Sequence, residues 1–220
     1  MALLTIDGRF NGPPTSGNGG VTCGMLAPFV EAPTVQVTLR LPPPVDTPLQ
    51  VTQIPDGASL YDGDALVAEA VPGTLSVTPP APASLADATA AAGRFLGYEG
   101  HPFPTCFVCG TARTDGLGLY AGPLSEGQVA CAWTPADSTV PMVWAALDCP
   151  GGWSADLPGR PMVLGRMTTR IDALPVVGEP HVVQGWLVGS EGRKVHTASA
   201  LHTADGTLLA LTQATWITIA

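Results

Sequence analysis

One acidic side chain stands directly after a long apolar stretch of the sequence. Every residue from Val140 to Leu147 is apolar, and the next residue is Asp148. A helix that is apolar on all sides is buried, and Pro150 is expected to end this helix at about Asp148, because proline cannot continue a helix. A carboxylate at the C-terminal end of a dry helix has a raised pKa, which suits a general base. The alternative is a carboxylate that caps a turn or reaches solvent.

A glycine-rich loop precedes a second apolar stretch near the start of the chain. The loop runs from Asn11 to Gly20 and ends in Asn18-Gly19-Gly20, and the apolar residues 21–30 after it can form a helix. Backbone N–H groups at a helix start bind anions or polarised carbonyl oxygens, and glycine lets a ligand approach the backbone closely. Asn11, Asn18, Gly19 and Gly20 are therefore candidate binding residues. The alternative is a flexible surface loop.

The cysteines do not form a recognisable framework. There are five, an odd number at irregular spacing, which argues against a set of disulfides: Cys23, Cys106, Cys109, Cys131 and Cys149. Cys106 and Cys109 form one CxxC pair, whereas a structural zinc site needs four ligands, normally two such pairs. His101 is a candidate third ligand, but the neighbouring sequence offers no fourth. The pattern favours a tight structural turn, and we expect neither a metal nor a cofactor.

Composition excludes several classes of function. The net charge of −9 and the lack of a Lys/Arg cluster argue against a nucleic-acid partner. No apolar run approaches the roughly 20 residues needed to cross a bilayer, and the first residues lack the pattern of a secretory signal. We therefore expect a cytoplasmic protein that does not bind membranes. The 26 glycines and 23 prolines, with 45% hydrophobic residues, indicate short strands joined by turns rather than disorder.

Alternating apolar and polar residues predict strands in both halves of the chain. The predicted strands span residues 1–10, 34–41, 49–54, 58–61, 65–71 and 74–78, and then 117–120, 128–133, 162–171, 182–188, 194–202 and 208–219. Residues 84–95 are alanine-rich, and Ser84 with Asp87 resembles a capping box, so a short helix is expected there.

Both halves follow the same order of strand, loop, apolar helix and antiparallel strands. A repeat of roughly 100 residues indicates two copies of one small domain, with a sheet wrapped around each apolar helix. The predicted division is an N-terminal domain at residues 1–80, a connecting segment at 81–110 and a C-terminal domain at 111–220. The predicted fold class is α+β.

These features resemble the double-hotdog acyl-CoA thioesterases, which contain two tandem hotdog domains. In single-domain hotdog thioesterases a motif close to His-Gly-Gly opens the central helix, and an Asp or Glu follows seven residues after the second Gly. Asn18-Gly19-Gly20 is similar to the first feature, with Asn in place of His, and Leu147-Asp148 is similar to the second. The Cys106-Phe-Val-Cys109-Gly segment also resembles one found in proteins of this type.

Each half departs from the family pattern in a complementary way. Ala27, not an acid, lies seven residues after Gly20, and Val140-Pro141 stands where the second half should carry Gly-Gly. Paired hotdog domains build each site across their interface, with an oxyanion hole from one domain and a carboxylate from the other. The resemblance therefore implies one composite site, made by Gly20 and Asp148, and an empty mirror-image site.

The resemblance also implies roles for the site residues. An acyl-CoA or carrier-bound thioester would lie between the helices, where the N–H groups of Gly20 and Gly19 polarise its carbonyl and Asn18 or Asn11 orients it. Asp148 would act as a general base on water, or as a nucleophile that gives an anhydride. Gln213, on the last predicted strand, is similar to the glutamine that helps to hold the water in double-hotdog thioesterases.

Two rival functions remain open at this stage. Hydratases and dehydratases of enoyl thioesters share the fold, but they usually pair Asp with His, and the sequence has no such pair beside Asp148. A non-catalytic protein that binds acyl groups or other ligands is favoured by the missing His. Fused hotdog pairs often assemble further, so a homo-oligomer is also expected.

Overall fold

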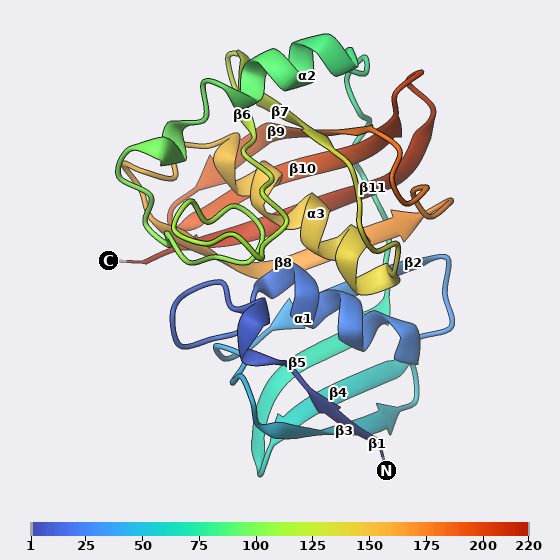
Figure 1. The fold of residues 1–220 in the computed structure, drawn as a ribbon. Coiled ribbons are helices and arrows are strands. Elements are labelled where there is room, and N and C mark those ends of the chain that lie inside the picture. Colours follow the sequence, from blue (N-terminus) through green and yellow to red (C-terminus); the bar gives the residue numbers. More distant parts are fainter. Residues whose placement is uncertain (1, 220) are drawn as a thin grey trace.

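The computed structural model describes residues 2–219, which form a single curved sheet with helices packed against it (Figure 1). The 11-stranded antiparallel sheet has the order β1-β3-β4-β5-β2-β8-β11-β10-β9-β7-β6. This arrangement confirms the α+β class. The strands are β1 (Ala2–Thr5), β2 (Thr34–Leu39), β3 (Pro48–Ile54), β4 (Gly57–Asp62), β5 (Ala65–Pro72), β6 (Gly122–Ser125), β7 (Gln128–Trp133), β8 (Met162–Ile171), β9 (His181–Glu191), β10 (Lys194–Thr203) and β11 (Leu208–Thr218).

The helices are α1 (Gly19–Leu26), α2 (Leu85–Ala92) and α3 (Val140–Trp153). Helices α1 and α3 lie side by side on one face of the sheet, and α2 packs against β6 and β7 (Figure 1). Ser84 caps α2 by accepting a hydrogen bond from the Asp87 N–H, as the sequence predicts. Among residues 2–219, no helix has the length and hydropathy needed to cross a membrane.

The two halves of the chain meet through one pair of strands. β2 of the first half pairs with β8 of the second, from Thr34 opposite Arg170 to Thr38 opposite Arg166. The apolar faces of α1 and α3 belong to one continuous core. The halves therefore share both a sheet and a core, and the boundaries near residues 80 and 110 stay a prediction.

Helix α3 continues past the residue predicted to end it. It runs through Pro150 to Trp153, and every residue from Met142 onward is buried. The last turn lies directly on the sheet, because a Cβ on Gly151 would be 2.8 Å from Thr197 Oγ1 and one on Gly185 would be 2.3 Å from the Pro150 carbonyl oxygen. Close packing against β9 and β10 offsets the cost of an internal proline. Asp148 thus lies inside the helix rather than at its C-terminal end.

Two predicted strands are not formed, because their polar groups have other partners. Residues 74–78 pair with no strand; Gln213 instead donates from Nε2 to the Thr74 carbonyl oxygen (3.1 Å) and accepts from the Ser76 N–H (3.0 Å). Residues 117–120 lie against the cysteine loop, where Leu117 and Leu119 donate backbone hydrogen bonds to the loop.

Candidate functional site

Asp148 joins the two central helices through one of its carboxylate oxygens. Its Oδ2 accepts hydrogen bonds from the Gly20 N–H (2.9 Å) and from Asn18 Nδ2 (3.0 Å). The side chain is only 2% exposed. Within residues 2–219, the other oxygen, Oδ1, is buried without a hydrogen-bond partner. The acid from the second half therefore reaches the helix start of the first half, as the sequence predicts.

The start of α1 is shaped to receive this carboxylate. Asn18 is the N-cap residue, and its Oδ1 accepts a hydrogen bond from the Val21 N–H (2.9 Å) while its Nδ2 donates to Asp148. A Cβ on Gly20 would lie 2.6 Å from Asp148 Cβ and 2.7 Å from the Trp144 carbonyl oxygen. Only glycine at position 20 lets α1 approach α3 closely enough for its amide to bind the carboxylate.

Burial controls the protonation of Asp148. Desolvation raises the pKa of this carboxyl to about 7, and the nearby Cys106 thiol adds to the rise. The hydrogen bonds from Gly20 and Asn18 lower the pKa and oppose the effect of burial. The sequence predicts a raised pKa from burial and from the end of the helix dipole. Burial is the main cause in the structure, whereas Asp148 lies inside α3 and not at its end.

A cavity of about 520 Å³ opens beside this carboxylate. Asn18, Gly19 and Asp148 line it together with apolar side chains such as Leu164 and Trp216. Within residues 2–219, the Gly19 N–H has no hydrogen-bond acceptor. The Gly20 N–H, in contrast, is bound to Asp148 and is not free for a substrate. The predicted donor role therefore suits Gly19, and Gly20 positions the acid.

Two other predicted residues lie away from this cluster. Asn11 Nδ2 donates to Thr105 Oγ1 (3.2 Å), and Asn11 Oδ1 accepts from Arg113 (3.0 Å), so this side chain fastens the loop and does not line the cavity. Gln213 pairs with Ala198 of β10, and the neighbours of Ala198, Thr197 and Ser199, face α3. Because side chains alternate along a strand, Gln213 points to the opposite face of the sheet. Neither side chain lines the cavity beside Asp148, where the predicted roles at the reacting carbonyl would require them to be.

Sequence reasoning missed part of the cavity wall. Cys106, Cys109 and Cys149 line the cavity, and their sulfur atoms lie within 4.8 Å of one another. Hydrogen bonds from the other two thiols lower the pKa of Cys106, whereas Cys149 and Cys109 have raised pKa values. Cys149 directly follows Asp148, and this adjacency was the available signal in the sequence.

His101 also lines the cavity but is not placed to act with Asp148. Its Nε2 lies 3.1 Å from the Cys109 carbonyl oxygen, and its Nδ1 accepts from the Phe103 N–H at 2.9 Å. Burial lowers its pKa. Both ring nitrogens are engaged by the backbone, so the His–Asp pair of a hydratase is not formed.

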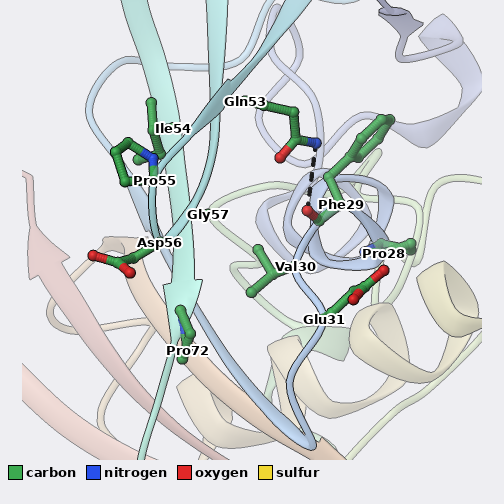
Figure 2. Close-up of a pocket in the computed structure, with 10 residues that line it drawn as sticks. All are labelled: Pro28, Phe29, Val30, Glu31, Gln53, Ile54, Pro55, Asp56, Gly57 and Pro72. Carbon is green, nitrogen blue, oxygen red and sulfur yellow. Dashed lines mark hydrogen bonds between the residues drawn. The ribbon is translucent and has the colours of Figure 1, made fainter.

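A second pocket, of about 550 Å³, lies near the end of α1 and the turn between β3 and β4 (Figure 2). Its carboxylates, Glu31 and Asp56, come from different segments and do not converge (Figure 2). Gln53 donates to the Phe29 carbonyl oxygen at 3.5 Å. The pocket has no group of side chains arranged for chemistry.

Comparison with solved structures shows the fold. The chain is similar to the tesB protein of Mycobacterium avium subs paratuberculosis, with a TM-score of 0.64 and 12% identity over 99% of this chain and 92% of that one. An acyl-CoA thioesterase II, TesB2, of Mycobacterium marinum gives a TM-score of 0.60 and 9% identity over 99% and 92% of the two chains. A conserved protein of unknown function with a hot dog fold from Alicyclobacillus acidocaldarius gives 0.63 and 13%, again over 99% and 92%.

These likenesses confirm the resemblance to hotdog thioesterases at the level of the fold. At such low identity they carry no residue roles to this chain. No family model matches the sequence, and no curated protein matches it significantly.

Proposed function

We propose that this chain hydrolyses acyl thioesters at one site between its halves, and that these halves are two fused hotdog units. The substrate class is an acyl-CoA or a carrier-bound acyl thioester. The names of two similar structures, a tesB protein and an acyl-CoA thioesterase II, support this class. An assembly of several chains stays a prediction.

One observation carries the proposal. A buried carboxylate from the second half, Asp148, is bound to the start of the first half's central helix, at the wall of a mostly apolar cavity. The converse site lacks both parts, since Ala27 and Pro141 stand at the corresponding sequence positions. Burying an acid costs stability, and buried acids with a shifted pKa are concentrated at functional sites. A concave apolar pocket with a few converging polar groups is a typical ligand site.

The chemistry follows from the two free groups beside the cavity. The Gly19 N–H would donate to the thioester carbonyl oxygen and stabilise the negative charge that develops there. Asp148 would take a proton from a water that attacks the carbonyl carbon. The C–S bond then breaks, the carboxylic acid is released, and the leaving thiolate receives the proton from Asp148. Asn18 and Gly20 would hold the carboxylate in position.

The alternative is a protein that binds acyl ligands without hydrolysing them. It is favoured by the bond between Asp148 and the Gly20 N–H, because this bond occupies one of the two amides predicted to polarise the carbonyl. Saturable thermal stabilisation by acyl-CoAs without release of free CoA would identify this function.

The direct test compares the parent protein with Asp148→Asn on acyl-CoAs of short, medium and long chain, with free CoA measured by mass spectrometry. General base catalysis contributes about 100-fold or more, so hydrolysis is expected to fall by at least that factor. Asp64→Asn, in an exposed turn, is the matched control and should hydrolyse at the parent rate. Equal turnover by Asp148→Asn and the parent would show that Asp148 is not the base.

A further inference from the structure

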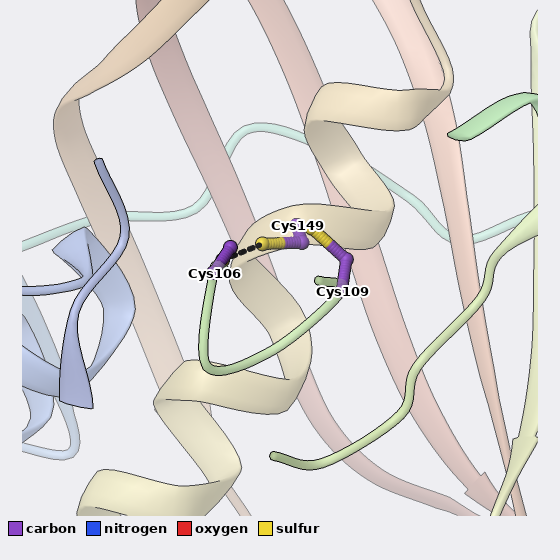
Figure 3. A group of neighbouring side chains, drawn as sticks. All are labelled: Cys106, Cys109 and Cys149. Carbon is purple, nitrogen blue, oxygen red and sulfur yellow. Dashed lines mark hydrogen bonds between the residues drawn. The ribbon is translucent and has the colours of Figure 1, made fainter. Parts of the chain in front are cut away.

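Three cysteine thiols converge at one point on the cavity wall (Figure 3). Cys106 and Cys109 come from the loop before β6, and Cys149 comes from α3 (Figure 3). The sulfur atoms of Cys106 and Cys149 are 3.7 Å apart, and all three sulfurs lie within 4.8 Å of one another. All three residues are buried.

We propose that Cys106, Cys109 and Cys149 bind one zinc ion through three thiolates, with the fourth coordination position open to the cavity. A tetrahedral ion with Zn–S bonds of about 2.3 Å separates its sulfur ligands by roughly 3.8 Å. The distance between Cys106 and Cys149 already matches this value, and the widest separation exceeds it by at most about 1 Å. The proposal does not depend on thioester hydrolysis.

The loop holds its two ligands in a fixed turn. The Gly110 N–H donates to the Cys106 carbonyl oxygen at 2.8 Å. A Cβ on Gly110 would lie 2.4 Å from that oxygen and 2.6 Å from the Pro104 carbonyl oxygen, so only glycine allows the turn to close. Leu119 donates its N–H to the Val108 carbonyl oxygen at 2.9 Å, between the two cysteines. Ligands held in this way lose little entropy when they bind an ion.

The surroundings provide a hydrogen-bond donor to sulfur and leave one coordination position open. Asn18 Nδ2 lies 3.8 Å from Cys106 Sγ, and N–H groups of this kind stabilise and orient metal ligands. The nearest histidine, His101, has both ring nitrogens engaged by the backbone. Zinc sites with three protein ligands keep the fourth position for water or an exogenous ligand, and the cavity is where such a ligand would enter.

The test measures metal content and ligand geometry in the full chain. The protein is reduced, stripped with a chelator, reconstituted with zinc or with cobalt(II), and freed of excess metal. We expect one zinc per chain by mass spectrometry, and a cobalt spectrum with thiolate charge-transfer and tetrahedral d–d bands. Cys106→Ser and Cys149→Ser should each lose tight zinc binding, whereas Cys131→Ser, which is buried in β7 outside the cluster, should keep it.

Circular dichroism of each variant verifies that loss of zinc is not loss of the fold. Reconstituted parent protein that holds far less than one zinc per chain would overturn the proposal. A folded Cys149→Ser that retains zinc as tightly as Cys131→Ser would also overturn it. Recovery of Cys106 and Cys149 as a disulfide that persists in the reduced preparation would do the same, because a disulfide leaves no thiolates for the ion.

Discussion

One carboxylate oxygen of Asp148 accepts both of its hydrogen bonds, and both donors come from the start of α1. The remaining oxygen has no partner within residues 2–219. A buried acceptor without a partner costs about 1–3 kcal/mol. One oxygen is therefore anchored, and the other is a buried acceptor with unused hydrogen-bonding capacity, which a general base would use to bind the attacking water.

Asn18→Asp tests the pairing of Asn18 with Asp148. The substitution keeps a good N-cap residue but replaces the donor to Asp148 by a second carboxylate about 3 Å away, and like charges at this distance disfavour joint ionisation. We expect a loss of about 1–3 kcal/mol in unfolding free energy at pH 8, measured by urea titration.

Asn18→Asp combined with Asp148→Asn is the matched control. The double variant restores one acid and one amide at the contact, so its stability should return toward that of the parent. Its hydrolysis should stay low, because the carboxylate has moved to the other helix. A double variant whose loss equals the sum of the two single losses would show that the two side chains are not coupled.

His202 is expected to contribute to the dependence of folding stability on pH. It is 3% exposed, its Nδ1 has no partner within residues 2–219, and burial lowers its pKa. Because the folded-state pKa lies below the unfolded value of about 6.5, the unfolded chain binds more protons as the pH falls. His202 therefore supports folding above pH 6.5, and this contribution is lost as the pH falls toward the folded-state pKa.

His202→Gln should flatten this dependence. Urea titrations at pH 7 and pH 5 are expected to show a smaller loss of stability on acidification in the variant than in the parent, whatever the cost of the substitution itself. Identical losses for the two proteins would show that His202 does not contribute to the acid sensitivity.

Helices α1 and α3 approach each other through two glycines one turn apart. A Cβ on Gly20 would meet Asp148 and the backbone of α3, and one on Gly24 would lie 2.6 Å from Pro141 Cα and 2.8 Å from Trp144 Cβ. These contacts set the distance at which the Gly20 N–H can reach the carboxylate. The close crossing of the helices is therefore a condition for the site.

Gly24→Ala tests the crossing without touching Asp148. The added methyl group must push α1 away from α3, and overpacking of this kind costs about 1–3 kcal/mol. Gly93→Ala is the control, because Gly93 has helical dihedral angles and a Cβ there would lie an ordinary 3.5 Å from the Ala90 carbonyl oxygen. Its stability should change by less than about 0.5 kcal/mol. Equal thermal unfolding of Gly24→Ala and Gly93→Ala would contradict the close crossing.

The two halves of the chain are joined by one strand pair and by hydrogen bonds to the segment that connects them. The β2–β8 pair joins the half-sheets, and Gln213 holds residues 74–76 on the outer face of the sheet. The site depends on this union, because its acid and its amides come from different halves. We expect neither half alone to hydrolyse thioesters.

Local patterns predicted much of this arrangement. The apolar run before Asp148 and the Asn18-Gly19-Gly20 loop indicated a buried helix, a lone acid and a helix start, and the structure brings these together. The predictions that failed concern features that depend on tertiary contacts. Helix α3 continues past Pro150 because Gly151 and Gly185 pack closely between the helix and the sheet. The face of the sheet on which Gln213 lies depends on how β11 is oriented against its neighbours. No local pattern shows that Cys149 contacts a loop about 40 residues earlier.

The central claim is that a bound thioester lies between Gly19 and Asp148. The most direct measurement is a crystal structure of the protein with a non-hydrolysable thioether analogue of acyl-CoA that retains the carbonyl group. We predict that the carbonyl oxygen lies about 3 Å from the Gly19 N–H, with a water molecule between Asp148 Oδ1 and the carbonyl carbon. An analogue bound with its carbonyl beyond reach of both groups, for example in the pocket beside Glu31 and Asp56, would contradict the account.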